Sequence, residues 1–146
     1  MKTIGIFDVI GPNMIGPSSS HTAGALRISL FARQQWAGNI KKVEFMLYGS
    51  FAETYRGHGT DRALIGGILG FNVEDTRIRN AFEHAHNAGI EYVFLRDREK
   101  MDVHPNTVDI TITDSNGHVN TVTGVSIGGS DAKIININGT DVEIYC

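Results

Sequence analysis

The sequence has little cysteine, no long apolar run and no cluster of basic residues. Its 146 residues include one cysteine, Cys146, which excludes a disulfide within the chain and makes the cytoplasm the expected compartment. No apolar run approaches the roughly 20 residues that cross a membrane, and no basic region followed by an apolar one marks a signal peptide. We therefore expect a cytoplasmic protein that does not contact a membrane.

The balance of charges argues against a nucleic-acid partner. The 13 Lys and Arg residues and 16 Asp and Glu residues give a net charge of −3, and no basic stripe is present. Hydrophobic residues make up 41% of the chain and charged residues 20%, which is typical of a soluble globular protein. The length allows one domain with a substantial core, and the chain contains no internal repeats.

Apolar spacing and turn residues predict helices in the first half of the chain and strands in the second. Helices are predicted at about residues 22–37, 51–56, 60–69 and 76–88. Strands are predicted at about residues 41–48, 90–95, 108–113, 119–127, 133–138 and 142–145, with a short strand or helix at 3–10.

This order of elements predicts an α+β fold with two layers. The last strands are joined by Asn116-Gly117 and Asn138-Gly139, which are strong hairpin signals. Three glycines weaken the helix predicted at 60–69, which close packing would explain: Gly66, Gly67 and Gly70. We expect one mixed, mainly antiparallel sheet with helices packed on one face.

A run of polar side chains precedes the first predicted long helix. It consists of Ser18, Ser19, Ser20, His21 and Thr22. Hydroxyl side chains are poor in helix interiors and good at helix starts, where backbone N–H groups lack partners. Such a helix end carries partial positive charge and suits a carboxylate or a phosphate. The alternative is that the serines only cap the helix and that His21 is solvated.

Two further loops combine histidine with hydroxyl or amide side chains. In the first, His58 lies between two glycines, which lets the imidazole reach a ligand and move a proton near neutral pH. Thr60 or Asp61 can then cap the following helix. The second loop contains His104 and Asn106 around a proline. The alternatives are an exposed loop histidine at 58 and a turn histidine at 104.

Other chemistries fit the pattern less well. A zinc site of His21, His58 and His104 with a water is conceivable, but no closely spaced pair of ligands supports it. A serine nucleophile needs a G-x-S-x-G turn, and a P-loop needs a second glycine and a lysine; residues 16–22 have neither pattern. His84, His86 and His118 are expected to be solvated.

Taken in order, the motifs closely resemble the β chain of the iron–sulfur-dependent bacterial L-serine dehydratases. The resemblance covers nearly the whole chain, and the S-S-S-H-T and G-H-G-T runs in this order are its most specific part. It rests on residues 7–8, 15–24, 47–52, 57–61, 104–107 and 126–129.

The resemblance implies an enzyme that converts L-serine to pyruvate and ammonia, a lyase. In that family a [4Fe–4S] cluster acts as a Lewis acid on the serine hydroxyl, and its cysteine ligands belong to an α chain. One cysteine cannot hold such a cluster, so this chain is expected to be half of an active site and inactive without the α chain. A homodimer is left open as well. Residues 1–146 correspond to the β domain, and the ACT domain that usually follows is absent from them.

By the same resemblance, His58 is the expected base for the Cα proton, with His21 as its substitute. The substrate carboxylate is expected to bind Ser18, Ser19, Ser20 and Thr22, and Gly59 and Thr60 are expected to bind substrate as well. His104 and Asn106 would hold the ammonium group or order their loop. No metal ligand is expected in this chain. The domain also resembles a serine-binding regulatory domain of some phosphoglycerate dehydrogenases, so a non-catalytic serine- or anion-binding domain is the alternative, ahead of a lone hydrolase.

Overall fold

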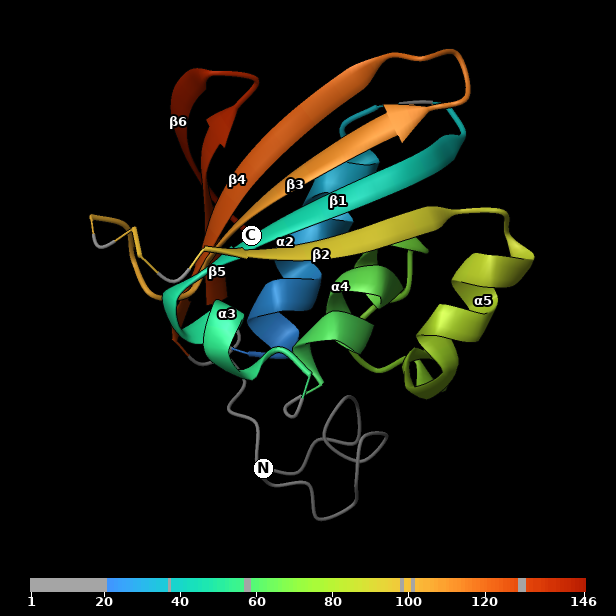
Figure 1. Ribbon diagram of the computed structural model, residues 1–146, viewed down its shortest axis with the longest axis horizontal. Helices are drawn as coiled ribbons and strands as arrows, with labels where there is room; N and C mark the ends of the chain where they lie inside the picture. The colour runs from blue at the N-terminus through green and yellow to red at the C-terminus, as the bar shows by residue number, and fades with distance from the viewer. Residues whose placement is uncertain (1–20, 37, 57–58, 98, 101, 129–130) are drawn as a thin grey trace.

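The fold consists of a six-stranded sheet with helices on one face (Figure 1). The computed structural model describes residues 21–146 except residues 37, 57–58, 98, 101 and 129–130. The described helices are α2 (Ala23–Gln34), α3 (Gly49–Thr54), α4 (Thr60–Ile68), the 3₁₀ helix η1 (Thr76–Asn80) and α5 (Ala81–Asn87). The strands are β1 (Ile40–Tyr48), β2 (Glu91–Asp97), β3 (Thr107–Asp114), β4 (Val119–Gly128), β5 (Asp131–Ile137) and β6 (Thr140–Tyr145). Within these residues, every helix is too short or too polar to span a membrane.

The sheet is mixed and mainly antiparallel, which confirms the predicted α+β class. Its strand order is β2-β1-β3-β4-β5-β6. β1 and β2 are parallel, and every other neighbouring pair is antiparallel. The predicted hairpins are present, with Gly117 at φ 87°, Asn138 at 52° and Gly139 at 89°. These positive φ angles are the ones that favour Asn-Gly in tight hairpin turns.

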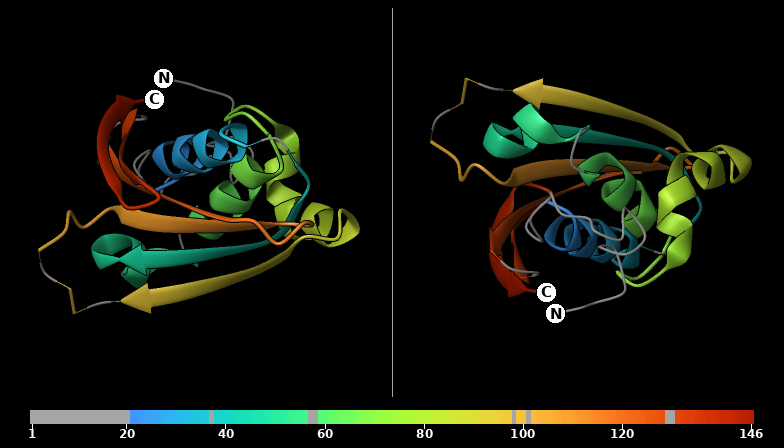
Figure 2. Two further views of the ribbon diagram at one scale, coloured as in Figure 1. Left: turned by 90° about the horizontal axis from the view of Figure 1, so that it is seen from above. Right: turned by 90° about the horizontal axis from the view of Figure 1, so that it is seen from below.

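The core lies between the helices and the covered face of the sheet. Alternate residues of the central strands point into it, including Val43, Phe45 and Leu47 of β1, which are fully buried. The apolar sides of α2, α3, α4 and α5 complete the same cluster. Figure 2 shows that the helices lie on one side of the sheet and that β5 and β6 curl around α2.

Helices α2 and α4 pack closely and run in the same direction. A Cβ atom on Gly67 would lie 2.7 Å from the Leu26 carbonyl oxygen, so only glycine permits this approach. The Ser29 hydroxyl donates to the Leu64 carbonyl, at 2.5 Å, and Arg33 donates to the Ile68 carbonyl one turn later, at 3.2 Å. Later residues of α2 contact later residues of α4, so the N-terminal ends of the two helices lie at the same end of the fold.

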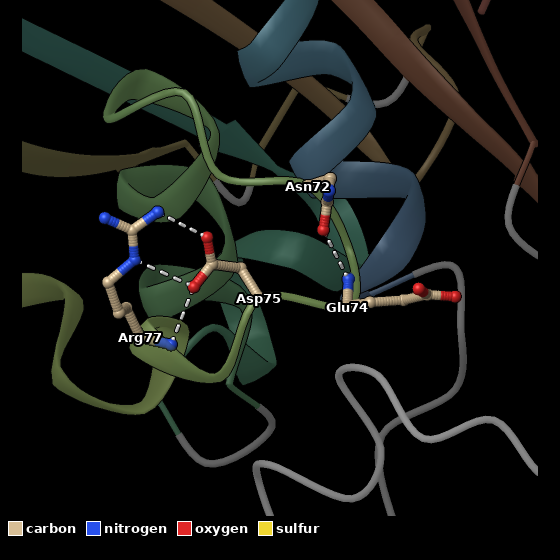
Figure 3. Close-up of polar contacts among 4 residues, drawn as sticks. All are labelled: Asn72, Glu74, Asp75 and Arg77. Carbon is tan, nitrogen blue, oxygen red and sulfur yellow. Dashed lines mark hydrogen bonds and ion pairs between the residues drawn. The ribbon is translucent and has the colours of Figure 1, made fainter.

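The third predicted helix begins with a 3₁₀ turn rather than an α-helix. Asp75 caps η1 by accepting a hydrogen bond from the Arg77 N–H, at 2.9 Å, and its carboxylate also binds the Arg77 guanidinium at 2.7 and 3.0 Å (Figure 3). Ile78 N–H donates to the Asp75 carbonyl three residues back, which is 3₁₀ bonding. The α-helical part therefore starts only at Ala81, and it ends before Gly89, as predicted.

The three remaining predicted surface histidines differ in burial. His86 and His118 are exposed, as expected. His84 is only partly exposed, because its ring packs edge-on against Phe71 with centroids 5.8 Å apart. The expectation of a solvated side chain is therefore wrong for His84.

Asp75→Ala should lower the free energy of unfolding by about 1 kcal/mol at pH 7, because the cap of η1 is lost. The Arg77 hydrogen bonds hold the pKa of Asp75 below its ordinary value. The charged carboxylate therefore stabilises the fold above the unfolded-state pKa of about 4, and this contribution is lost as pH falls through the lower folded-state pKa. Urea unfolding from pH 7 to pH 2 should show the wild-type and variant stabilities converging.

Asp75→Asn is the matched control, since it keeps a capping oxygen but removes the charge. It should cost less than Asp75→Ala at pH 7. A stability difference between wild type and Asp75→Ala that stays constant across this pH range would contradict the assigned role of the carboxylate.

Candidate functional site

Residues from the three candidate loops gather at one end of the fold. The C-terminal ends of β1 and β2 and the N-terminal ends of α2, α3 and α4 lie there (Figure 1). We call this region the polar end and define it by residues His21, Thr22, Ser50, 59–61, 104–107 and 126. Ser18, Ser19, Ser20 and His58 lie outside the described residues.

His21 is held at the polar end by the start of α3. Its Nε2 atom is hydrogen-bonded to the Ser50 hydroxyl, at 2.9 Å. Its ring also packs edge-on against Phe51 of α3, with centroids 5.6 Å apart. The imidazole is partly buried, so the alternative of a fully solvated histidine is wrong. A histidine held in one orientation by neighbouring groups is suited to proton transfer.

The loop before β3 supports the start of α3 through the Pro105 carbonyl. The N–H groups of Ser50 and Phe51 donate to this oxygen at 2.7 and 3.3 Å. Gly49 has φ 54°, and a Cβ atom there would lie 2.6 Å from the Pro105 Cα atom. The glycine is therefore required both for the backbone angle and for the approach of the loop.

His104 orders its own loop. Its Nδ1 atom accepts a hydrogen bond from the Asn106 N–H, at 3.0 Å, and its carbonyl accepts one from the Thr107 hydroxyl, at 2.6 Å. The Asn106 carbonyl in turn accepts from the Ser126 N–H, at 3.0 Å. This chain of bonds joins the candidate loop to the end of β4, and His104 itself is exposed.

Helix α4 begins differently from the prediction that Thr60 or Asp61 caps it. Gly59 is the N-cap residue, with φ 79° and no side-chain cap. Thr60 is fully buried in the first turn. Asp61 is nearly buried and accepts from the Arg62 N–H, at 2.8 Å. Burial raises the pKa of the Asp61 carboxyl, although hydrogen bonds from the backbone and nearby arginines oppose the shift.

The polar end presents the positive ends of two parallel helices. Thr22 is the N-cap of α2 and is fully buried, and its hydroxyl makes no capping hydrogen bond. The macrodipoles of α2 and α4 add at this end, because the helices run in the same direction. The arrangement suits a small anion such as a carboxylate, as the polar run before α2 predicted.

Three buried polar atoms of the polar end lack a hydrogen-bond partner. They are Thr60 Oγ1, Asn106 Oδ1 and Ser126 Oγ; within the described residues the other such side-chain atom is Arg27 Nε. A buried polar group without a partner costs about 1–3 kcal/mol, so such groups are rare in folded proteins. Their accumulation at one end indicates a place prepared for a polar ligand. Ser126 was not singled out as a site residue from the sequence, although it lies in one of the stretches on which the family resemblance rests.

A second polar network lies on the uncovered face of the sheet. Asp109 accepts hydrogen bonds from the Tyr48 hydroxyl and from the Thr123 hydroxyl, each at 2.6 Å. Burial, together with the hydrogen bond to Asp109 and its charge, raises the pKa of Tyr48 far above its ordinary value. Tyr48 therefore stays protonated near neutral pH and cannot act as a base.

The described residues do not form a metal centre. Across the described part of residues 21–146, no three His, Cys, Asp or Glu side chains are grouped as a metal site requires. Cys146 is half-buried, its Sγ atom lies 4.0 Å from the Arg27 carbonyl oxygen, and burial raises the pKa of its thiol. The zinc hypothesis includes His58 and so extends beyond the described residues. Its two described members are bonded to Ser50 and to the Asn106 N–H.

A family model and several known proteins match this chain, and all of them are serine dehydratases or chains of them. Residues 5–90 match the family model described as serine dehydratase beta chain. The chain is 50% identical to an L-serine dehydratase beta chain from Peptoniphilus asaccharolyticus over 98% of its length, and 49% identical to a probable L-serine dehydratase beta chain from Bacillus subtilis (strain 168) over 99%. It spans 64% of the length of each of these relatives. It is also 30% identical, over 86% of its length, to an L-serine dehydratase from Streptomyces coelicolor, of which it covers 32%.

Gly49→Ala should destabilise the fold more than Gly117→Ala. Both glycines have positive φ, where a side chain costs about 1–2 kcal/mol. A Cβ atom on Gly117 would meet nothing within 4 Å, whereas one on Gly49 would meet the backbone of Pro105. We expect a loss of about 3 kcal/mol or more for Gly49→Ala, measured by urea unfolding. Equal losses in the two variants would mean that the Pro105 contact does not hold α3 in place.

Proposed function

The chain belongs to the serine dehydratase beta chain family, and from this premise we propose that it forms, with an α chain, the active site that deaminates L-serine to pyruvate and ammonia. The main support is 50% identity to a serine dehydratase β chain over nearly the whole chain. The polar end supports the proposal independently, because it combines helix N-termini for a carboxylate with a held imidazole for a proton. Residues 1–146 make up the β domain in this proposal.

The α chain supplies the [4Fe–4S] cluster. A cluster is generally held by several cysteine thiolates, and this chain has one cysteine. The thiol of that cysteine is half-buried and its pKa is raised, which disfavours the thiolate that binds iron. The S. coelicolor relative, in which the matched region covers 32% of the protein, is named L-serine dehydratase without a chain designation. Its length beyond that region leaves room for a part equivalent to the α chain.

This chain's part is to bind and orient L-serine. The substrate carboxylate binds at the starts of α2 and α4, through Ser18, Ser19, Ser20 and Thr22 together with Gly59 and Thr60. The positive helix ends favour the anion, and the buried Thr60 hydroxyl gains the partner that it lacks in the described fold. Asn106 has a buried side-chain oxygen that can accept from the substrate ammonium group, and His104 orders the loop that carries it.

The second part of this chain's role is to remove the Cα proton of L-serine. We assign this step to His58, with His21 as the substitute, because imidazole accepts protons near neutral pH. The imidazole takes the proton from the substrate Cα atom, the Cβ–O bond breaks, and the departing hydroxide takes up that proton to leave as water, which returns the imidazole to its neutral form. The resulting aminoacrylate tautomerises to the imine, and hydrolysis then gives pyruvate and ammonia. The reaction therefore consumes one water after releasing one.

We further infer that the protein works in the cytoplasm, since a chain with one cysteine has no disulfide framework for an oxidising compartment.

The chain mixed with its α chain under anaerobic conditions should produce pyruvate from L-serine, and neither chain alone should do so. The physical reason is that the base and the carboxylate-binding groups lie on one chain and the iron ligands on the other. Pyruvate is measured with a coupled lactate dehydrogenase assay. Isothermal titration calorimetry of this chain alone with L-serine is the companion measurement. Tight binding by the lone chain together with an inactive mixture would favour the non-catalytic regulatory domain instead.

His58→Ala should lower kcat of the mixed chains by at least about 100-fold, because general-base catalysis contributes roughly 10²–10⁴-fold. His118→Ala is the matched control, since His118 is an exposed hairpin histidine, and it should leave kcat unchanged. A loss of less than tenfold in His58→Ala would remove His58 from the base role. If His21→Ala then gave the larger loss, the role would pass to His21.

A further inference from the structure

Ser126 places an unpartnered hydroxyl beneath the first turn of α2. The residue lies near the end of β4 and is fully buried. Its N–H donates to the Asn106 carbonyl, but its Oγ atom has no hydrogen-bond partner. A serine in a strand interior with no partner costs folding free energy without any visible gain in the described fold.

The first turn of α2 offers backbone donors at the same place. The first hydrogen bond of the helix joins the Leu26 N–H to the Thr22 carbonyl, at 2.9 Å. The N–H groups of Ala23, Gly24 and Ala25 therefore have no partner within the helix. The Thr22 side chain makes no capping hydrogen bond to them.

Gly24 is the residue at which the Ser126 hydroxyl contacts the first turn of α2. A Cβ atom on Gly24 would overlap the Ser126 hydroxyl and would lie 3.0 Å from the Ser126 Cβ atom. The absence of a side chain at position 24 is thus what allows the hydroxyl to lie against the helix backbone. The Asp131 carbonyl is a nearby acceptor, 3.5 Å from the same hypothetical Cβ atom, yet the Ser126 hydroxyl does not donate to it.

We propose that Ser126 is a substrate-binding residue whose hydroxyl, together with the first-turn N–H groups of α2, binds the carboxylate of the amino-acid substrate. This inference rests on the proposed function and adds a residue from β4 to the carboxylate-binding groups of the helix starts. The hydroxyl is screened from bulk water, so its hydrogen bond to an anion does not compete with solvent. A site of this kind discriminates strongly against a substrate that lacks the anionic group.

Ser126→Ala separates this role from a structural one, because the two roles predict opposite changes in stability. If the hydroxyl is reserved for the substrate, its removal should leave the melting temperature of the complex unchanged or raise it. The KM for L-serine should rise about 10- to 100-fold, as expected for a lost hydrogen bond to a charged group, with a smaller change in kcat. Ser126→Cys keeps the side-chain shape with a somewhat larger atom and a weaker donor, and it should give an intermediate KM.

Ser29→Ala is the matched control. Ser29 is also fully buried against α2, but its hydroxyl donates to the Leu64 carbonyl. Its removal should lower the melting temperature and leave KM unchanged. The pair thus compares a buried hydroxyl that stabilises the fold with one that binds substrate.

The experiment uses the complex of this chain with its α chain, assembled anaerobically, and compares L-serine with L-serinamide, which lacks the carboxylate. The preference of the wild type for L-serine in kcat/KM should shrink by at least tenfold in Ser126→Ala. An active wild-type complex whose KM and preference do not change in Ser126→Ala overturns this inference alone. So does a lowered melting temperature with an unchanged KM. A wild-type complex that makes no pyruvate overturns both this inference and the proposed function.

Discussion

The close approach of α2 and α4 is the constraint on which the polar end depends. Gly67 lets the backbone of α4 reach the Leu26 carbonyl, because it has no Cβ atom to prevent this approach. The helices run in the same direction, so their positive ends lie together and their macrodipoles add. Each of these helices is short, so neither end alone would make a strong anion site. Their parallel packing is what brings the positive ends of both macrodipoles to one place.

A second constraint links this end to the sheet. The Pro105 carbonyl accepts from the start of α3, and the bonds from His104 through Asn106 continue to Ser126 in β4. His21, before α2, reaches the same assembly through Ser50. Residues far apart in the sequence are thereby held by a network, mostly of backbone hydrogen bonds, that the strand pairing positions. The core stabilises the fold, and this network holds the polar groups at fixed positions on it.

The helices and strands could be predicted from the sequence, but the convergence of the candidate loops at one end of the fold could not. Alternating residues such as Val43, Phe45 and Leu47, and the Asn-Gly hairpins, are local signals and gave the right strands. The cap of the third helix at Asp75 was predicted, but the 3₁₀ form of its first turn was not, because apolar spacing does not distinguish a 3₁₀ turn from an α-helical one. The convergence of the loops depends on the parallel β1–β2 pair and on helix packing, which are long-range features. Ser50 and Ser126 were therefore missed as site residues, although both lie in motifs of the family resemblance.

The unpartnered atoms at the polar end also explain why a small domain would carry groups that weaken it. Thr60 Oγ1, Asn106 Oδ1 and Ser126 Oγ each lower stability in the described fold, and apolar replacements would remove that cost. Selection for stability alone would eliminate such atoms. Their retention at the end where two helix dipoles meet is what the proposed binding function predicts, since a bound ligand would supply the missing hydrogen bonds. A domain that only supported a partner would have no physical reason to place three of them there.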